Sequence, residues 1–234
     1  YGAENTYGKL VNTLYSKFNK QYDIYFYAYD WRKSNSENAE LLEKFINDNR
    51  YDKVNFIAHS MGGVLASEYL RRSTENVNKM EKLITLGTPY LGAPKALYTL
   101  ETGNFFDDII TDTFTKKFLQ YVVNNFFSVY ELLPTEKFFN LNGAIYVKRH
   151  DRNIYTEKSG IRVVNTTKKL NYNETYNLIS RREWATNNKN LLKPMLPNSE
   201  KFHIGLFQKE HIANSVNLYA IIGYGKKTLM ELKE

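Results

Sequence analysis

The sequence predicts an α/β protein with a mostly parallel sheet, and three observations lead to this prediction. Apolar residues at helical spacing alternate with short strand-like runs in the first part of the chain. One of these runs ends in a serine-containing turn that leads directly into a helical pattern. At 234 residues the chain is long enough to bury a core and hold an insertion. Alternating strands and helices form parallel sheets because each parallel connection needs a crossover.

The first elements follow from spacing and capping. Residues Tyr7 to Lys17 place apolar side chains at helical spacing and predict an amphipathic helix. Tyr22 to Tyr29 is rich in aromatic residues and predicts a strand, which leads into Asp30-Trp31-Arg32. Ser34 and Glu37 have the spacing of a capping box, so a helix should follow them.

The central stretch runs from Val54 to Ala66. Val54 to Ala58 predicts a buried strand, and a helical pattern begins after Gly62 and Gly63. Ser60 lies at the tip of the turn between them, in the small-x-Ser-x-Gly form of a nucleophile elbow. Ala58 stands where the usual pattern has glycine. By itself this string is also compatible with a serine that caps the helix.

The later chain predicts an insertion followed by a return to the sheet. Lys82 to Leu86 predicts a further buried strand. We expect residues 1–94 to form the first part of the core, residues 95–200 a cap or lid, and residues 201–234 the returning part. Within the cap, the sequence predicts helix over 105–127, a short strand at 161–164, and loops and helical turns over 165–200. A helix over 199–213 and a strand over 215–222 complete the prediction.

Composition narrows the classes of function. The formal net charge is +7, and the basic residues are scattered without a long block. This pattern favours a solvated surface over nucleic-acid binding, and it permits a weaker attraction to anionic lipid headgroups. The absence of cysteine excludes disulfides, a thiol nucleophile and thiolate metal sites. No His/Asp/Glu cluster has ligand spacing, so we expect neither a metal nor a cofactor.

No apolar run approaches the ~18 residues that span a bilayer, so we expect no transmembrane segment. The sequence does not separate a cytoplasmic from a secreted protein, and it does not indicate an oligomeric state. It starts with Tyr1 rather than Met and shows no signal-peptide pattern. We therefore expect it to be a fragment of a longer chain.

Three blocks of the sequence together resemble the lecithin:cholesterol acyltransferase family of α/β-hydrolases. They are Tyr29-Asp-Trp-Arg32, Ala58-His-Ser-Met-Gly62 and Leu86-Gly-Thr-Pro-Tyr-Leu-Gly-Ala-Pro94. Tyr130-Glu-Leu-Leu-Pro134 resembles the Leu-Pro element of the family's cap. Ala220 to Thr228 resembles the strand and loop before the family's catalytic acid. The resemblance implies an α/β-hydrolase fold with an inserted cap and a serine-dependent lipase, phospholipase or acyltransferase, as in bacterial members.

The resemblance also assigns site residues. Ser60 would be the nucleophile, and the backbone N–H of Met61 would be one oxyanion donor. Trp31, Arg32 and Tyr90 would border the substrate, with Trp31 against an acyl chain and Arg32 near a carboxylate or phosphate. A buried Asp30–Arg32 arrangement that anchors the loop is the alternative for this block. The family's acid and histidine are expected beyond Glu234, and its first oxyanion loop before Tyr1.

The four histidines within the chain do not fit the family's catalytic histidine. His59 precedes the nucleophile directly and should point away from it in a tight turn. His150 lies in a charged stretch, while His203 and His211 come before the expected acid, which reverses the usual order. Three aspartates, Asp107, Asp108 and Asp112, are expected to be solvated charges. Phe105, Phe106, Phe126 and Phe127 either face a lipid cleft or hold the cap on the core.

These observations predict serine-dependent acyl transfer on lipid esters, through an acyl-enzyme on Ser60, with a lipid or ester substrate and possible contact with a lipid surface. Water and an alcohol remain alternative acceptors, which correspond to hydrolase and transferase. The rival functions are a generic carboxylesterase or amidase on the same fold and a non-catalytic binding module with a degenerate elbow.

Overall fold

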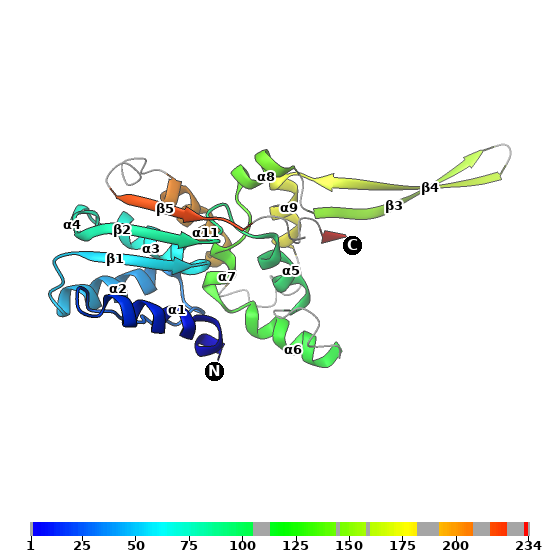
Figure 1. The fold of residues 1–234 in the computed structure, drawn as a ribbon. Helices are drawn as coiled ribbons and strands as arrows, with labels where there is room; N and C mark the ends of the chain where they lie inside the picture. Colours follow the sequence, from blue (N-terminus) through cyan, green and yellow to red (C-terminus); the bar gives the residue numbers. More distant parts are fainter. Residues whose placement is uncertain are drawn as a thin grey trace. The chain divides into compact units, whose positions relative to one another are not determined.

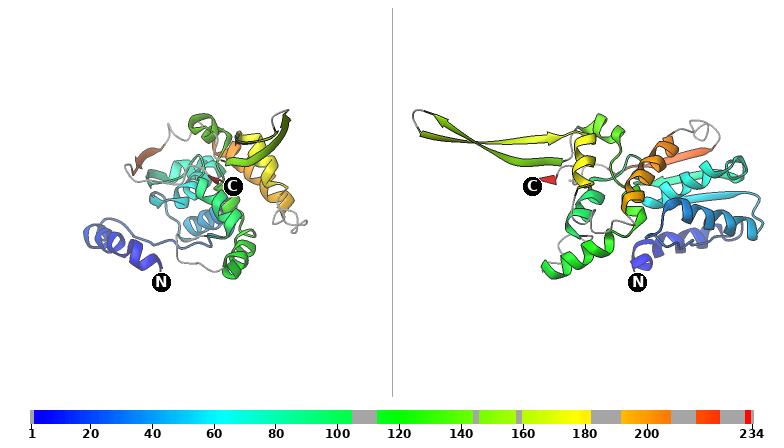
Figure 2. Two further views of the ribbon diagram at one scale, coloured as in Figure 1. Left: turned by 90° about the vertical axis from the view of Figure 1, so that its right-hand side faces the viewer. Right: turned by 180° about the vertical axis from the view of Figure 1, so that it is seen from behind.

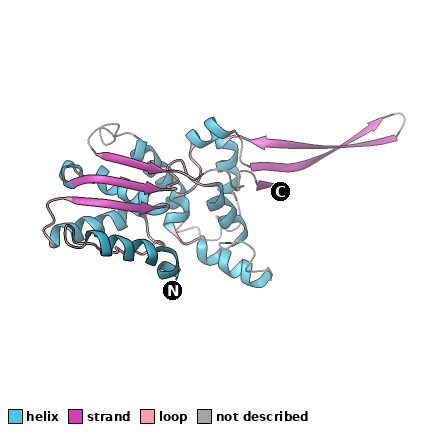
Figure 3. Ribbon diagram, viewed as in Figure 1, coloured by secondary structure: helices cyan, strands magenta, loops and turns pink. Residues whose placement is uncertain are grey.

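The structure is a computed structural model that describes residues 2–104, 113–143, 146–157, 160–181, 192–207, 216–223 and 232–233. Its contacts divide the chain into two compact units, Tyr1–Asp30 and Trp31–Glu234. Figures 1 and 3 show the elements, coloured by sequence and by secondary structure. The predicted boundaries of core, cap and returning segment remain predictions.

The first unit contains α1 (Gly2–Phe18), which includes and extends the predicted helix. The rings of Tyr7 and Phe26 lie 6.1 Å apart within this unit. The strand predicted for Tyr22–Tyr29 is absent, since residues 23–30 form neither helix nor strand. Aromatic propensity favours an extended backbone, but a strand also needs a hydrogen-bonded neighbour, and propensity does not supply one.

The second unit contains a parallel sheet with the order β1-β2-β5. Its strands are β1 (Val54–His59), β2 (Met80–Leu86) and β5 (Asn217–Ile221), and all three confirm predicted strands. α2 (Asn35–Asp48) precedes β1, while α3 (Met61–Arg72) and α4 (Thr74–Lys79) connect β1 to β2. The hydroxyl of Ser34 accepts a hydrogen bond from the Glu37 N–H and caps α2, as its spacing predicts.

The prediction that β1 is buried is only half right. Alternate residues along β1 are half-buried and exposed, and Ile57 keeps 43% of its surface. In the described sheet β1 is an edge strand that pairs only with β2. α3 packs against β1 and β2, and its Val64, Leu65 and Tyr69 are buried. The apolar run of β1 therefore reflects strand propensity as well as burial.

Helices form the next part of the second unit. They are α5 (Pro94–Thr102), α6 (Thr113–Val123), α7 (Phe127–Glu131), α8 (Glu136–Asn142), α9 (Tyr172–Ile179) and α11 (Leu192–Phe207). We call these six helices the helical region. Eleven buried apolar side chains from this region and the end of β4 form one cluster, which includes Leu97, Leu100, Tyr130, Leu133 and Ile179. The helical region therefore has a hydrophobic core of its own.

A long antiparallel hairpin, β3 (Tyr146–Glu157) and β4 (Gly160–Leu170), leaves the helical region near α8 and α9 (Figures 1 and 2). Of the described strands, only the short β6 (Leu232–Lys233) pairs with it. The sequence predicted just a short strand at 161–164 here. Loops and helical turns were expected over 165–200, where the described residues include the end of β4, α9 and much of α11. Charged residues at consecutive positions hide the alternation that identifies a strand.

Candidate active site

Ser60 lies between the end of β1 and the start of α3 with a backbone φ of 53° and ψ of −126°. Among the described non-glycine residues, only Ser60 and Arg50 have a positive φ. This conformation is unfavourable for a residue with a Cβ atom, and such strain is concentrated at functional sites. A strand–serine–helix turn in this conformation has the form of a nucleophile elbow.

The hydroxyl of Ser60 does not cap α3, although the residue occupies the N-cap position. An ordinary serine cap has an extended backbone and accepts a hydrogen bond from the first turn. Ser34 does both at the start of α2, with a φ of −63° and a ψ of 148°. Ser34 and Ser60 therefore differ in both backbone conformation and hydrogen bonding, and only Ser34 has the geometry of a cap.

Close contacts fix the backbone on both sides of the turn. The Ser60 N–H donates to the Leu86 carbonyl at 2.9 Å, which joins the turn to the end of β2. A Cβ atom at Gly63 would lie 2.0 Å from the Thr88 hydroxyl oxygen, so α3 can approach the loop after β2 only with glycine there. The tight contact at this crossing thus lies at Gly63, one residue after the glycine of the elbow pattern.

Met61 is the first residue of α3. The first N–H groups of a helix have no acceptor within it, and the helix dipole adds positive potential at this end. An oxyanion beside Ser60 would meet these groups. The assignment of Met61 as an oxyanion donor remains a prediction, and the helix start is where that role requires it to be.

The structure pairs two of the sequence blocks that carry the family resemblance. The Ala93 N–H donates to the Leu132 carbonyl at 2.8 Å, and the Thr135 N–H donates to the Leu91 carbonyl at 2.9 Å. Between these bonds, Gly92 has a φ of 86°, and a Cβ atom there would lie 2.2 Å from the Leu133 carbonyl oxygen. The loop after β2 is thus fastened to the Leu-Leu-Pro segment, and α5 begins at Pro94 directly after it.

The predicted substrate-binding residues are half-buried or exposed. The rings of Trp31 and Phe126 meet edge to face with centroids 5.2 Å apart, and Trp31 keeps 41% of its surface. Arg32 is exposed, and Tyr90 is half-buried in the turn after β2. Phe126 also packs against the core of the helical region, which favours the structural alternative for this aromatic residue. Phe105, Phe106 and the three aspartates of 107–112 lie outside the described residues.

The structure describes the side chains of two of the four histidines, His59 and His203. His203 is buried, and its Nε2 lies 2.7 Å from the Glu131 carbonyl oxygen. Burial lowers the pKa of His203, while the hydrogen bond to Glu131 acts in the opposite direction. His59 is exposed, the side chain of His150 is not described, and His211 lies outside the described residues. His203 therefore contributes to packing between α11 and α7.

A buried polar cluster connects four helices, and the sequence did not predict it. One Glu131 carboxylate oxygen accepts from the backbone N–H of Asn35 at 2.7 Å and from its side-chain amide at 2.8 Å. Burial raises the pKa of Glu131 to about 7, the Asn35 hydrogen bonds oppose this rise, and Glu68 adds to it. Glu68 is 1% exposed and forms a bidentate pair with Arg71, with both distances 2.6 Å.

Glu131 thus holds the N-terminus of α2, four residues after Trp31, from the side of α7. Carboxylates with raised pKa values are frequent at functional sites. The only signal in the sequence was a glutamate within the apolar run Tyr130 to Leu133. That signal does not reveal Asn35 or His203 as partners, because both come from distant parts of the chain.

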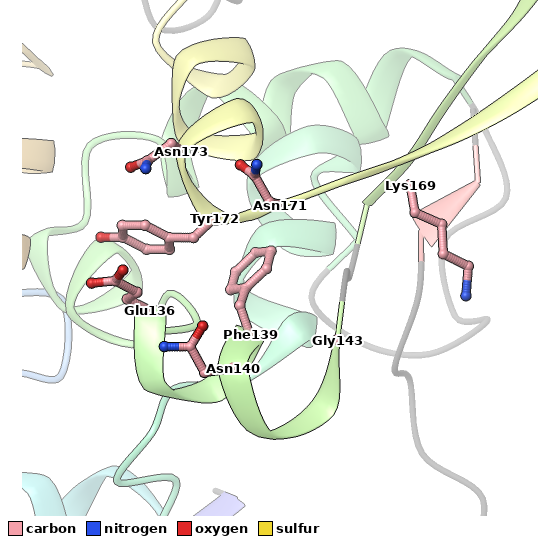
Figure 4. A pocket seen from close by; sticks show the side chains of 8 residues that line it. All are labelled: Glu136, Phe139, Asn140, Gly143, Lys169, Asn171, Tyr172 and Asn173. Carbon is pink, nitrogen blue, oxygen red and sulfur yellow. The ribbon is translucent and has the colours of Figure 1, made fainter.

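A cavity of about 420 Å³ lies between α8 and the start of α9 (Figure 4). The rings of Phe139 and Tyr172 meet there at 5.6 Å, and Asn140, Asn171 and Asn173 border the opening. None of the site residues predicted from the sequence lines this cavity. It is a feature of the helical region and is separate from the proposed nucleophile's residues.

Two comparisons bear on this arrangement. The lecithin:cholesterol acyltransferase family model matches residues 3–232. The chain belongs to the lecithin:cholesterol acyltransferase family. A comparison with curated proteins gives no match. Membership confirms the resemblance inferred from the three sequence blocks and covers nearly the whole chain.

Among solved structures, the chain is similar to a chain of the Tle4–Tli4 complex, with a TM-score of 0.50 and 14% identity. The similarity covers 81% of this chain and 42% of that one, so this chain corresponds to under half of the matched chain. The fold is that of an α/β-hydrolase, with a parallel sheet and helices around it. At this identity the similarity shows fold alone.

The family is named for acyl transfer from lecithin to cholesterol. Within the described part of the chain, no helix combines the length and apolar character needed to cross a membrane. The same residues contain no group of three or more His, Asp or Glu side chains placed to hold a metal ion.

Proposed function

We propose that the protein catalyses serine-dependent acyl transfer on lipid esters, with Ser60 as the nucleophile. The observation that supports this most directly is the positive φ of Ser60 at the junction of β1 and α3, without a capping bond. Family membership supports the lipid-ester class of substrate. The acyl acceptor is water or an alcohol.

The chemistry has two steps. The Ser60 hydroxyl loses its proton to a general base and attacks the ester carbonyl, which forms a tetrahedral oxyanion. Collapse of this intermediate breaks the ester C–O bond, releases the alcohol with a proton from the base, and leaves the acyl group on Ser60. Water or an alcohol then attacks the acyl-enzyme by the same route and regenerates the serine.

Other residues have roles around this step. The Met61 N–H, at the start of α3, stabilises the oxyanion, and loss of one such donor typically costs about 3 kcal/mol. Trp31 contacts the acyl chain with its exposed edge, Arg32 contacts an anionic group of the substrate, and Tyr90 borders the pocket from the turn after β2. His203 does not supply the base, because its Nε2 is engaged with the Glu131 carbonyl.

The test is covalent labelling of the full-length protein with a fluorophosphonate probe. We expect the wild type to label and Ser60→Ala to lose labelling together with roughly 10⁴-fold or more of its ester turnover. Ser67→Ala is a matched control, because Ser67 also lies on α3 but donates to the Gly63 carbonyl. Equal labelling of the wild type and Ser60→Ala would refute the nucleophile assignment.

The lipid class needs a second measurement. Turnover of a phospholipid in micelles is compared with that of a short soluble ester, above and below the critical micelle concentration. Faster turnover at the lipid surface supports the proposal. A preference for the soluble ester, with no change on micelle formation, would instead indicate a generic carboxylesterase.

A further inference from the structure

The β3–β4 hairpin has a strong excess of positive over negative charge. Residues 146–170 contain seven of the 32 Lys and Arg residues and two of the 25 Asp and Glu residues. This segment therefore has a net charge of +5, against +7 for the whole chain. The other 25 Lys and Arg residues are nearly balanced by 23 Asp and Glu residues, so the net charge of the chain resides largely in this segment.

The pairing register places several basic residues next to one another at the end of the hairpin near the helical region. Lys148 lies directly opposite Lys168, and Lys169 lies opposite Val147 on the next rung. Arg149 sits at the register shift between Lys148 and His150. Three basic residues thus occupy two adjacent rungs, and Arg149 follows them at the register shift, although 20 positions separate Lys148 from Lys168 in the sequence.

Like charges directly opposite on paired strands destabilise a hairpin. A two-stranded hairpin without further strands is also marginal in water. Apart from two residues of β6, the described strands offer β3 and β4 no other partner. An external anionic partner would relieve the repulsion between these rungs, so the element favours binding of negative charge.

We propose that the β3–β4 hairpin is a basic arm that docks the protein on an anionic lipid surface. This inference rests on the proposed function, since a lipid-ester enzyme must reach substrate in a lipid phase. Each strand extends for ~40 Å at the rise of an antiparallel strand, and the views show it leading away from α8 and α9 (Figure 2). Lysines and arginines near an anionic leaflet are attracted to it within about a Debye length.

The test is co-sedimentation of the full-length Ser60→Ala protein with vesicles of phosphatidylcholine and phosphatidylserine in a 7:3 ratio, against pure phosphatidylcholine. Catalysis is silent in this background. We expect binding to the anionic vesicles, little binding to the neutral ones, and release as salt is raised. The variant Lys148→Glu, Arg149→Glu, Lys168→Glu and Lys169→Glu should weaken vesicle affinity about 30-fold or more.

The matched control reverses four exposed lysines elsewhere: Lys9→Glu, Lys20→Glu, Lys117→Glu and Lys201→Glu. It changes net charge equally and should lower affinity only about threefold, through the general field. Equal losses of vesicle affinity in the two variants would refute the role of the hairpin. The same conclusion would follow if the Ser60→Ala protein bound neutral and phosphatidylserine-containing vesicles equally well at low salt. If the protein bound a DNA duplex more tightly than the anionic vesicles, the proposal that a lipid surface is its partner would be wrong.

Turnover of a short soluble ester separates this proposal from the proposed function. The hairpin variant in a Ser60 background should hydrolyse that ester at the wild-type rate, with an unchanged Tm. Failure of the wild type to hydrolyse any ester would refute the function, whereas vesicle binding would still report on the arm. If the hairpin variant lost vesicle binding and also had a lowered Tm, a damaged fold could explain the loss. Lys148→Gln and Lys168→Gln would then decide, because they remove charge without reversing it and should give an intermediate loss of vesicle affinity with an unchanged Tm.

Discussion

The elbow at Ser60 and the polar cluster at Glu131 place functional groups in the fold by opposite means. At the elbow, neighbouring segments of chain impose an unfavourable backbone conformation, and Gly63 and the Leu86 carbonyl hold it. At Glu131 the backbone is helical, and burial changes the chemistry of the side chain instead. The first kind of site leaves a pattern in the sequence because it is local. The second leaves almost none, because its partners come from α2, α3 and α11.

The largest structural effect is expected at the elbow, from Gly63→Ala. The new Cβ atom would overlap the side chain of Thr88, so the free energy of unfolding should fall by about 1–3 kcal/mol. Chemical denaturation measures this loss. Ester turnover should fall as well, because α3 and the Ser60 turn would shift together.

Thr88→Ala provides the matched partner in a double-mutant cycle. The Thr88 hydroxyl is buried without a hydrogen-bond partner, so its removal alone should lower the free energy of unfolding only slightly. In the double variant, much of the free energy of unfolding lost in Gly63→Ala should be recovered, because Thr88→Ala removes two of the three atoms that the new Cβ would overlap. Additive losses would show that this contact does not hold the elbow.

At the polar cluster, Glu131→Gln tests whether burial controls the carboxyl group. The folded-state pKa of about 7 is above the ordinary value of 4.5, so folding favours the protonated form. The stability that this group contributes is complete below about pH 4.5 and is lost as pH rises through 7. The free energy of unfolding of Glu131→Gln, measured relative to that of the wild type, should therefore rise by about 3 kcal/mol between pH 4.5 and pH 8.

Urea denaturation at several pH values gives this difference. Glu131→Leu serves as the control, since it removes the charge but leaves both Asn35 donors without an acceptor. It should be less stable than Glu131→Gln at every pH. If the difference in free energy of unfolding between Glu131→Gln and the wild type did not change with pH, the raised pKa of Glu131 would be contradicted.

The smallest effect is expected at Trp31, which lies beside the cluster and borders the proposed substrate site. Trp31→Ala removes the edge-to-face contact with Phe126 from a side chain that is 41% exposed. Stability should fall by about 1 kcal/mol, because the Asn35–Glu131 hydrogen bonds still hold the start of α2. On a long-chain ester, KM should rise while kcat changes little, and an unchanged KM would remove Trp31 from the substrate site.

Much of the architecture could be predicted where local signals agree with the fold. Helical spacing identified α1, Ser34 marked the start of α2, and β-branched runs identified β1, β2 and β5. The prediction failed for Tyr22–Tyr29, where strand propensity has no pairing partner, and for the hairpin, where consecutive charges mask the alternation. Both failures concern strand pairing, which is non-local.

By itself the sequence determined the family and the strand–serine–helix turn, because both depend on residue types at short spacing. Only the tertiary structure decided that Gly63 lies against Thr88, that Glu131 holds Asn35, and that Lys148 faces Lys168. In each of these pairs the partners are well separated along the chain. Such contacts depend on how helices and strands pack, and packing is a property of the whole fold that short-range patterns do not encode.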